Sequence, residues 1–280
     1  MSTAVIVLAV LAFVLGLGLA VAARIFAVNV DPRIEKITEI LPGANCGGCG
    51  YAGCSDLAKA IVEGKAGVDA CPVGSAEVAE KIAKIMGVEL SGDKVRKVAI
   101  VLCSGDDQVA SKKFYYNGIE DCASAALIFG GDKSCKYGCL GLGTCADVCP
   151  FDAIDMLPSG LARVDPERCT GCGKCVDACP KGIIKLVPID RKVHVLCSSH
   201  DKGGKVRKIC KVGCIGCQKC AKEAPEGAIT MEENLAVVNY DIEIPESVAG
   251  VCPTHTIVIR GEHLEEVEAS EEAKAAGGAV

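Results

Sequence analysis

Cysteine spacing carries the clearest chemical information in this sequence. One segment reads CTGCGKCVDACP, in which successive cysteines are separated by two, two and three residues and proline follows the last. This run holds [4Fe–4S] clusters in bacterial-type ferredoxins, where three cysteines bind one cluster and the fourth binds a neighbouring one. The preceding segment ends in the matching pair Cys149-Pro150. Two interlocked runs of this kind predict a pair of iron–sulfur sites.

The pattern occurs twice along the chain. CKYGCLGLGTCADVCP (135–150) aligns without a gap with CKVGCIGCQKCAKEAP (210–225), and VLCS at 101–104 recurs at 195–198. Such self-similarity indicates a tandem duplication of a two-cluster ferredoxin unit. The second copy lacks cysteine at the four positions of one site, which are Ala224, Ile242, Pro245 and Val248. It keeps the four of the other site, which are Cys214, Cys217, Cys220 and Cys252. Loss of one whole ligand set beside an intact one indicates cluster binding.

The first copy has an irregularity, because Leu142 stands where a cysteine is expected. Cys135 is the nearest replacement, and the resulting site is Cys135, Cys139, Cys145 and Cys179. The partner site is then Cys149, Cys169, Cys172 and Cys175. Four cysteines are left over, and they could hold a fifth cluster between the copies or be buried structural thiols. They are Cys103, Cys122, Cys197 and Cys210.

A separate group of four cysteines precedes the repeats. It begins in the glycine-rich segment LPGANCGGCGYAGC and ends in a Cys-Pro pair, and its members are Cys46, Cys49, Cys54 and Cys71. Glycines let the backbone approach a cluster and supply N–H donors. A zinc site is the alternative for four cysteines, but the ferredoxin run downstream favours a [4Fe–4S] cluster. The sequence thus predicts four clusters, or five if the leftover cysteines also bind one.

The composition agrees with metal ligands. The chain of 280 residues contains 20 Cys and no Trp, with only 5 Phe and 5 Tyr, so large aromatic cores are not expected. Clusters that bind on folding can stabilise small domains in place of such a core. The triplet spacing fits metal ligands better than an extracellular disulfide scaffold. The net charge of −6 gives no reason to expect nucleic-acid binding.

The N-terminal segment can cross a membrane. Residues 3–23 contain no charged side chain, and at roughly 1.5 Å per residue a helix of this length matches a hydrocarbon core about 30 Å thick. A cleaved signal peptide is the alternative, although no Lys or Arg precedes the run. Positive charges follow it, at Arg24, Arg33 and Lys36. We therefore expect a single-pass anchor in the cell (inner) membrane with the soluble part on the cytoplasmic side, where thiols stay reduced.

The elements that must position these cysteines are short. Periodicity predicts helices over 31–41 and 75–86, and a buried strand over 95–102 that leads to Cys103. We expect an α+β chain with one transmembrane helix, a small four-Cys [4Fe–4S] domain and tandem bacterial-type ferredoxin-like domains. The expected boundaries are 1–30 for the anchor, 31–90 for the four-Cys domain, 91–194 for the two-cluster ferredoxin-like domain, 195–261 for the degenerate second copy and 262–280 for an acidic tail.

The residues outside the cysteine runs suggest no bond-making active site. The sequence contains no Ser/His/Asp array and no phosphate loop, so the expected chemistry is one-electron transfer. The four histidines have no ligand spacing with the cysteines and are expected at the surface: His194, His200, His255 and His263. A basic stretch could steer an acidic ferredoxin, although a solvated loop is the alternative. It comprises Lys202, Lys205, Arg207, Lys208 and Lys211.

Taken together, these features resemble the B component of the Rnf electron-transport complex. The resemblance covers the apolar N-terminus, the LPGANCGGCGYAGC domain, the stretch from Lys112 to Cys122 and the ferredoxin repeats. It implies a subunit of a membrane complex that passes electrons from reduced ferredoxin to NAD⁺ and couples this transfer to Na⁺ or H⁺ translocation. The missing site in the second copy departs from the two-cluster pattern. Two alternatives remain, a polyferredoxin of another membrane redox complex, such as a hydrogenase or reductase, and a zinc-stabilised scaffold.

Overall fold

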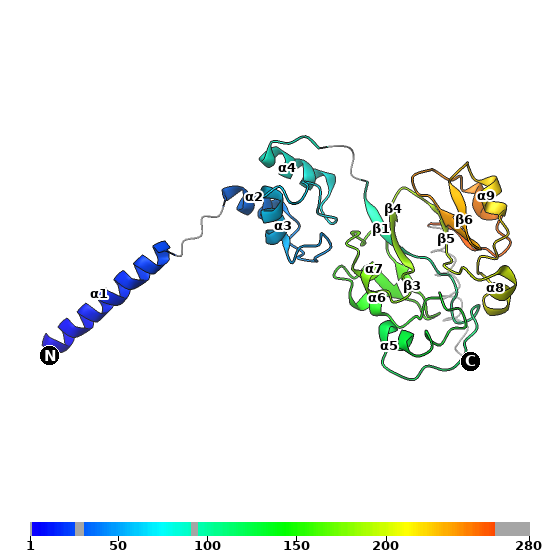
Figure 1. The fold of residues 1–280 in the computed structure, drawn as a ribbon, viewed down its shortest axis with the longest axis horizontal. Coiled ribbons are helices and arrows are strands. Elements are labelled where there is room, and N and C mark those ends of the chain that lie inside the picture. Colours follow the sequence, from blue (N-terminus) through cyan, green and yellow to red (C-terminus); the bar gives the residue numbers. More distant parts are fainter. Residues whose placement is uncertain (1, 26–30, 91–94, 261–280) are drawn as a thin grey trace, which may run out of the picture.

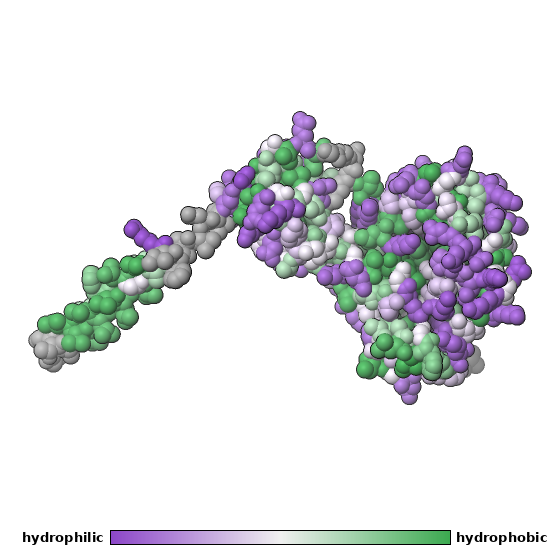
Figure 2. All heavy atoms as spheres, in the orientation of Figure 1, coloured by the Kyte–Doolittle hydropathy of each residue, from purple (hydrophilic) through white to green (hydrophobic). Residues whose placement is uncertain are grey.

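The computed structural model describes residues 2–25, 31–90 and 95–260. Helix α1 (Ser2–Ile25) contains a stretch, Val5–Arg24, with a mean hydropathy of 3.0 that is long and apolar enough to cross a membrane. The ribbon of this helix is drawn in Figure 1. Its large apolar side chains are exposed at consecutive positions around the helix, and Figure 2 shows one face of them. A helix that is apolar on every side is suited to lipid.

Three helices form the first globular unit. They are α2 (Pro32–Ile40), α3 (Cys54–Val62) and α4 (Ala76–Met86), and Ile37, Leu57 and Ile82 lie at the centre of their core. The Ser75 hydroxyl caps α4 by accepting the N–H of Val78 at 3.4 Å, and Gly87 ends it in the left-handed conformation. Both helices predicted in this region are confirmed to within about a residue at each end.

The first ferredoxin copy is built from two antiparallel strand pairs and three short helices. Strand β1 (Lys97–Val101) pairs with β4 (Ile184–Pro188), and β2 (Ile154–Met156) pairs with β3 (Ala162–Val164). The helices are α5 (Cys122–Leu127), α6 (Thr144–Asp147) and α7 (Lys174–Ala178). The centre of the strand predicted over 95–102 is confirmed, with Val101 opposite Ile184.

The second copy repeats this order of elements (Figure 1). Strand β5 (Val193–Val195) pairs with β8 (Ile257–Ile259), and β6 (Ile229–Glu232) pairs with β7 (Leu235–Val238), again antiparallel. Its helices are α8 (Gly203–Ile209), α9 (Lys219–Glu223) and α10 (Ser247–Gly250). By sequence alignment α9 corresponds to α6 and α10 to α7, so the repeated cysteine pattern coincides with a repeated fold.

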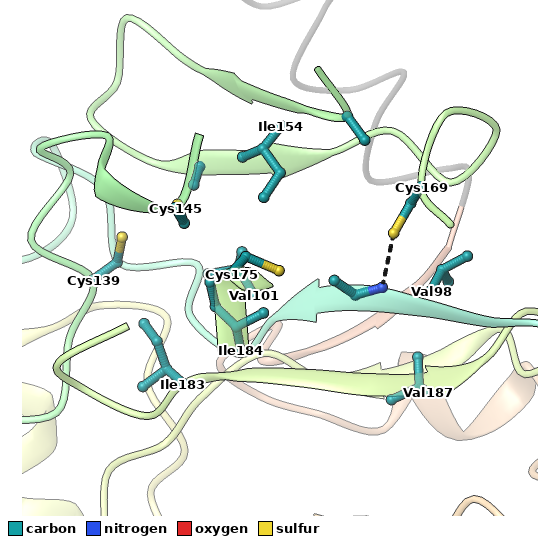
Figure 3. Close-up of a cluster of buried hydrophobic side chains, with 13 residues drawn as sticks. Val98, Val101, Cys139, Cys145, Ile154, Cys169, Cys175, Ile183, Ile184 and Val187 are labelled. Atoms are coloured by element: carbon teal, nitrogen blue, oxygen red, sulfur yellow. Dashed lines mark hydrogen bonds between the residues drawn. The ribbon is translucent and has the colours of Figure 1, made fainter. Parts of the chain in front are cut away.

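Cysteines form part of the hydrophobic cores. In the first copy, the strand residues Val98, Val187 and Ile154 pack in one cluster that also contains Cys169 and Cys175 (Figure 3). The apolar side chains in this cluster are mostly Val, Ile and Ala, and no aromatic residue is fully buried in it. The small core agrees with the expectation that ligand bonds supply much of the stability.

The histidine prediction is wrong for one residue. His194 is 0% exposed because it lies on β5, all three residues of which are buried against the core. Its Nδ1 lies 3.0 Å from the hydroxyl oxygen of Tyr240. His255 is exposed, as predicted, and His200 is half-buried. His263 and the predicted acidic tail lie outside the described residues.

Candidate iron–sulfur centres

A side-chain hydrogen bond holds the glycine-rich loop of the four-Cys unit. Asn45, which precedes Cys46, has a φ of +46° and accepts the backbone N–H of Cys54 at 2.8 Å. This bond joins the start of the loop to the start of α3. Cys49, Cys54 and Cys71 all pack in the core of this unit, and the N–H of Gly74 donates to the Cys71 sulfur at 3.3 Å. These three cysteines therefore share one core although Cys71 lies outside the loop.

The ferredoxin run forms a cavity of its own. Four cysteines line it, each from the set predicted as one site: Cys149, Cys169, Cys172 and Cys175. The N–H of Ala99 on β1 donates to the Cys169 sulfur at 3.3 Å (Figure 3), and the N–H of Ala153 donates to the Cys149 sulfur at 3.4 Å. Backbone donors of this kind favour the anionic form of a bound cluster and tune its reduction potential.

A second cavity of the first copy is lined by Cys122, Cys139, Cys145 and Cys179. The structure thus brings Cys122, rather than Cys135, to the other three residues of the predicted site. Thr144 secures this position, because its hydroxyl oxygen accepts the N–H of Cys122 at 2.7 Å and its O–H donates to Asp121 at 2.8 Å. Asp121 in turn caps α5 by accepting the N–H of Ser124 at 2.7 Å.

A third cavity lies where the two copies meet. The cysteines that line it are Cys103 and Cys135 from the first copy and Cys197 and Cys210 from the second. The N–H of Cys139 donates to the Cys103 sulfur and the N–H of Ser199 donates to the Cys197 sulfur, each at 3.4 Å. Of the four leftover cysteines of the sequence, three therefore lie together here, and Cys135 takes the place that was expected for Cys122.

The remaining cysteines of the second copy also lie near one another. Burial raises the pKa of the Cys220 thiol to about 11, and the neighbouring sulfurs of Cys214, Cys252 and Cys217 contribute to the increase. The N–H of Thr256 donates to the Cys252 sulfur at 3.4 Å. Cys217 is the one exposed cysteine of the 20, all of which lie in the described ranges. This site therefore has a solvent-exposed ligand at Cys217.

Apolar side chains fill the position of the lost site. Val248 is 0% exposed in the core of the second copy, and Ala224 and Ile242 pack against the same core. These residues stand where a two-cluster unit has cysteine ligands, so apolar contacts stabilise this part of the second copy in place of a cluster.

The chemistry of the donor sets fits iron–sulfur clusters. In a [4Fe–4S] cubane each cysteine binds a different iron, so the thiols surround a space instead of meeting at a point. In the described part of the chain no three His, Cys, Asp or Glu side chains converge as they would on a single metal ion. Burial raises the pKa of Cys145, Cys175 and Cys197 to about 12. Iron binding must therefore displace protons from these thiols.

Two glycines of the four-Cys unit pack closely against the ferredoxin unit. A Cβ atom on Gly48 would overlap the carbonyl group of Cys172, and one on Gly47 would lie 3.3 Å from Nζ of Lys174. Both contacts are made by residues in or beside the cysteine runs. The loop that carries Cys46 and Cys49 therefore lies against the loop that carries Cys172.

Family models match the four-Cys unit and the cysteine runs of the first ferredoxin copy. The model described as "Putative Fe-S cluster" matches residues 41–73, and the model described as "4Fe-4S dicluster domain" matches residues 134–183. The first range holds the four-Cys unit. The second holds the cysteines of the two first-copy cavities, apart from Cys122.

Curated relatives extend the similarity to nearly the whole chain. The B component of the Na⁺-translocating ferredoxin:NAD⁺ oxidoreductase complex of Acetobacterium woodii is 51% identical over 84% of this chain and 70% of the relative. The B component of the ion-translocating oxidoreductase complex of Methanosarcina acetivorans is 43% identical over 91% and 96%, and the proton-translocating counterpart of Clostridium ljungdahlii is 45% identical over 96% of each chain. The chain therefore belongs to the family of B components of the Rnf-type, ion-translocating oxidoreductase complexes.

Proposed function

We propose that this chain is the electron-carrying B component of an Rnf-type complex, and that it accepts electrons from reduced ferredoxin and relays them towards NAD⁺ reduction coupled to Na⁺ or H⁺ translocation. The observation that carries the proposal is the set of cavities lined by four cysteines each, in a chain whose relatives are such components. The flavin, nicotinamide and ion-path chemistry would belong to other subunits.

The proposed domain organisation keeps the boundaries expected from the sequence. It comprises an anchor over 1–30, a four-Cys domain over 31–90, ferredoxin-like copies over 91–194 and 195–261, and a tail over 262–280. The duplicated order of strands and helices supports the division between the copies. The helix with its apolar surface supports the anchor, and we place the soluble part on the cytoplasmic side because basic residues follow the apolar run.

The cysteines have the role of ligands in this proposal. Bound clusters supply one-electron transfer, and the chain holds them in fixed positions. Backbone N–H groups donate to sulfurs at four of the sites: those of Gly74, Ala99, Cys139, Ala153, Ser199 and Thr256. Two predicted ligand sets keep all four members together, and a third exchanges one ligand. In the four-Cys unit Cys49, Cys54 and Cys71 share one core.

The contact between Gly48 and Cys172 supports a continuous path through the chain. It brings the four-Cys loop against the ferredoxin loop, so electrons could pass between the two units without a mobile carrier. The interlocked cysteine runs keep the two sites of the first copy adjacent, because Cys175 and Cys179 share one short helix and its C-cap.

A basic surface supports ferredoxin docking on the second copy. Lys202, Arg207, Lys208 and Lys211 are exposed on and beside α8, and this face of the molecule is mainly hydrophilic (Figure 2). Lys205 forms an ion pair with Asp201 at 2.9 Å and so contributes less net positive charge. On its inner side α8 contributes Val206 and Ile209 to the cavity between the copies. A docked acidic protein would therefore lie one helix away from a cysteine cavity.

The experiment that tests the proposal is isolation of the assembled membrane complex through a tag on this chain. We expect a brown preparation that reduces NAD⁺ with electrons from reduced ferredoxin and stops doing so when this chain is removed. Co-purification of a hydrogenase or another reductase without ferredoxin-dependent NAD⁺ reduction would support the polyferredoxin alternative. A colourless, zinc-loaded chain would exclude electron transfer.

A further inference from the structure

We propose that Cys103, Cys135, Cys197 and Cys210 hold a fifth [4Fe–4S] cluster at the junction of the two ferredoxin copies, and that Cys122, not Cys135, completes the site of Cys139, Cys145 and Cys179. This inference deepens the proposed electron-transfer function and rests on it. Cys122 and Cys135 exchange places between the two predicted ligand sets, so each residue fills the position that the other leaves.

The junction site has an internal pseudo-symmetry. Cys103 and Cys197 occupy the same place in the repeated VLCS segment, and Cys135 and Cys210 are the first residues of the two aligned cysteine runs. Each copy therefore contributes the same pair of cysteines to one cavity. A fifth site built from Cys122 in place of Cys135 would lack this symmetry, since the second copy has no residue that corresponds to Cys122.

The backbone around the junction holds the two pairs of cysteines together. The N–H of Ser104 donates to the Leu196 carbonyl at 3.2 Å, and the N–H of Lys211 donates to the Val109 carbonyl at 3.0 Å. Gly105 lies at the centre, because a Cβ on it would be 3.3 Å from the Cys210 sulfur and 3.6 Å from the Cys103 sulfur. Sulfurs from both copies thus face one glycine.

A buried cation lies beside the same cavity. Lys133 is only 1% exposed and lines the cavity with the four cysteines. Its Nζ donates to the Gly105 carbonyl at 2.8 Å and lies 3.6 Å from a carboxylate oxygen of Asp107. A buried ammonium group is suited to a site that carries net negative charge, as four thiolates around a [4Fe–4S] cluster do.

Cys122 supplies the ligand that the first copy lacks at Leu142. The aligned residue in the second copy is Cys217, so the second copy has its full triplet and the first does not. The segment between Cys103 and Cys135 is longer than that between Cys197 and Cys210, and the additional residues include Cys122 at the start of α5. The cavity with Cys139, Cys145 and Cys179 receives Cys122 from this insertion. Thr144 on α6 fixes it through the 2.7 Å hydrogen bond.

Iron and acid-labile sulfide counts on paired Cys→Ala variants of the full chain test the ligand sets. We expect about 20 iron atoms per wild-type chain, and about four fewer for Cys103→Ala, for Cys135→Ala and for the two combined, because both residues serve one cluster. Cys103→Ala combined with Cys122→Ala should lose about eight, because these two residues serve different clusters. The opposite result, with about eight lost for the 103/135 pair and four for the 103/122 pair, would overturn the proposed exchange.

A rescue experiment separates ligand loss from misfolding. Introducing Leu142→Cys into the Cys122→Ala variant should restore about four iron atoms and the associated electron paramagnetic resonance signal. The change gives the first copy the same cysteine triplet that the second copy has at Cys214, Cys217 and Cys220. The same Leu142→Cys change in Cys135→Ala should restore nothing. Rescue of Cys135→Ala instead would contradict the assignment. A wild-type count of about 16 would remove the fifth cluster while leaving the proposed function intact, and a count near zero would remove both.

Discussion

Gly48 lies so close to Cys172 that no side chain fits between the four-Cys loop and the ferredoxin loop. Gly48→Ala should therefore push the two loops apart while each retains its cysteines. Because electron transfer slows steeply as clusters separate, we expect transfer between the two units to slow by at least about tenfold with unchanged iron content. Freeze-quench spectroscopy after rapid partial reduction measures it. Gly204→Ala is the control, since a Cβ there contacts nothing within 4 Å; equal effects of both changes would contradict a path through this contact.

The buried Lys133 should raise the reduction potential of the proposed junction cluster. Reduction adds negative charge, which a nearby ammonium group stabilises. Lys133→Met should lower that one potential by roughly 50–90 mV, which corresponds to a Coulomb energy on the order of 1–2 kcal/mol. A redox titration followed by electron paramagnetic resonance would detect the shift. Lys112→Met is the matched control, because Lys112 pairs with the same Asp107 at 2.9 Å but does not line the cavity. A shift of equal size in the control would assign the effect to Asp107.

Charge reversal on the α8 surface should weaken ferredoxin docking. Lys208→Glu with Lys211→Glu is expected to reduce the second-order rate of ferredoxin oxidation about tenfold or more at low salt, with the difference shrinking as ionic strength rises. Stopped-flow mixing at several salt concentrations measures this. Lys84→Glu on α4 provides a control with the same kind of charge reversal at another exposed position. If the double variant behaves like Lys84→Glu at every salt concentration, α8 is not the docking surface.

His194 should make the fold less stable in mild acid. Burial lowers its pKa to about 3, with the charge of Arg260 adding to the effect. The unfolded chain takes up a proton near pH 6.5, so the folded state loses stability as the pH falls below that value, at about 1.4 kcal/mol per pH unit. Between pH 7.5 and 5.5, His194→Gln should lose about 1.4 kcal/mol less than the wild type in anaerobic denaturant unfolding. His255→Gln, at an exposed position, should follow the wild type; a His194 variant that did the same would disprove the assignment.

The sequence predicted those features that depend on local spacing. The helices at 31–41 and 75–86 follow from periodicity. The interlocked ferredoxin run grouped Cys149, Cys169, Cys172 and Cys175, and these four residues line one cavity. The positions of Cys122 and Cys135 depend on how α5 folds back onto α6, which is a long-range contact through Thr144. Nearness in sequence favoured Cys135, and only the unequal length of the two repeats could have suggested otherwise.

The burial of two polar residues also could not be predicted from the sequence. His194 and Lys133 carry no sequence signal for burial, because their positions depend on the pairing of β5 with β8 and on the junction of the two copies. In the second copy, by contrast, replacement of a ligand set by Ala224, Ile242 and Val248 could be read from the alignment. The structure shows the result as a continuous apolar core.

Direct reduction of the detergent-solubilised full chain by reduced ferredoxin tests the central claim. On anaerobic stopped-flow mixing, the visible absorbance of the chain should bleach as ferredoxin becomes oxidised, in a salt-dependent second-order reaction, and the signals of reduced [4Fe–4S] clusters should appear. An iron-loaded chain that stays oxidised after mixing, although a strong chemical reductant bleaches it, would contradict the account of this protein as the acceptor of electrons from ferredoxin.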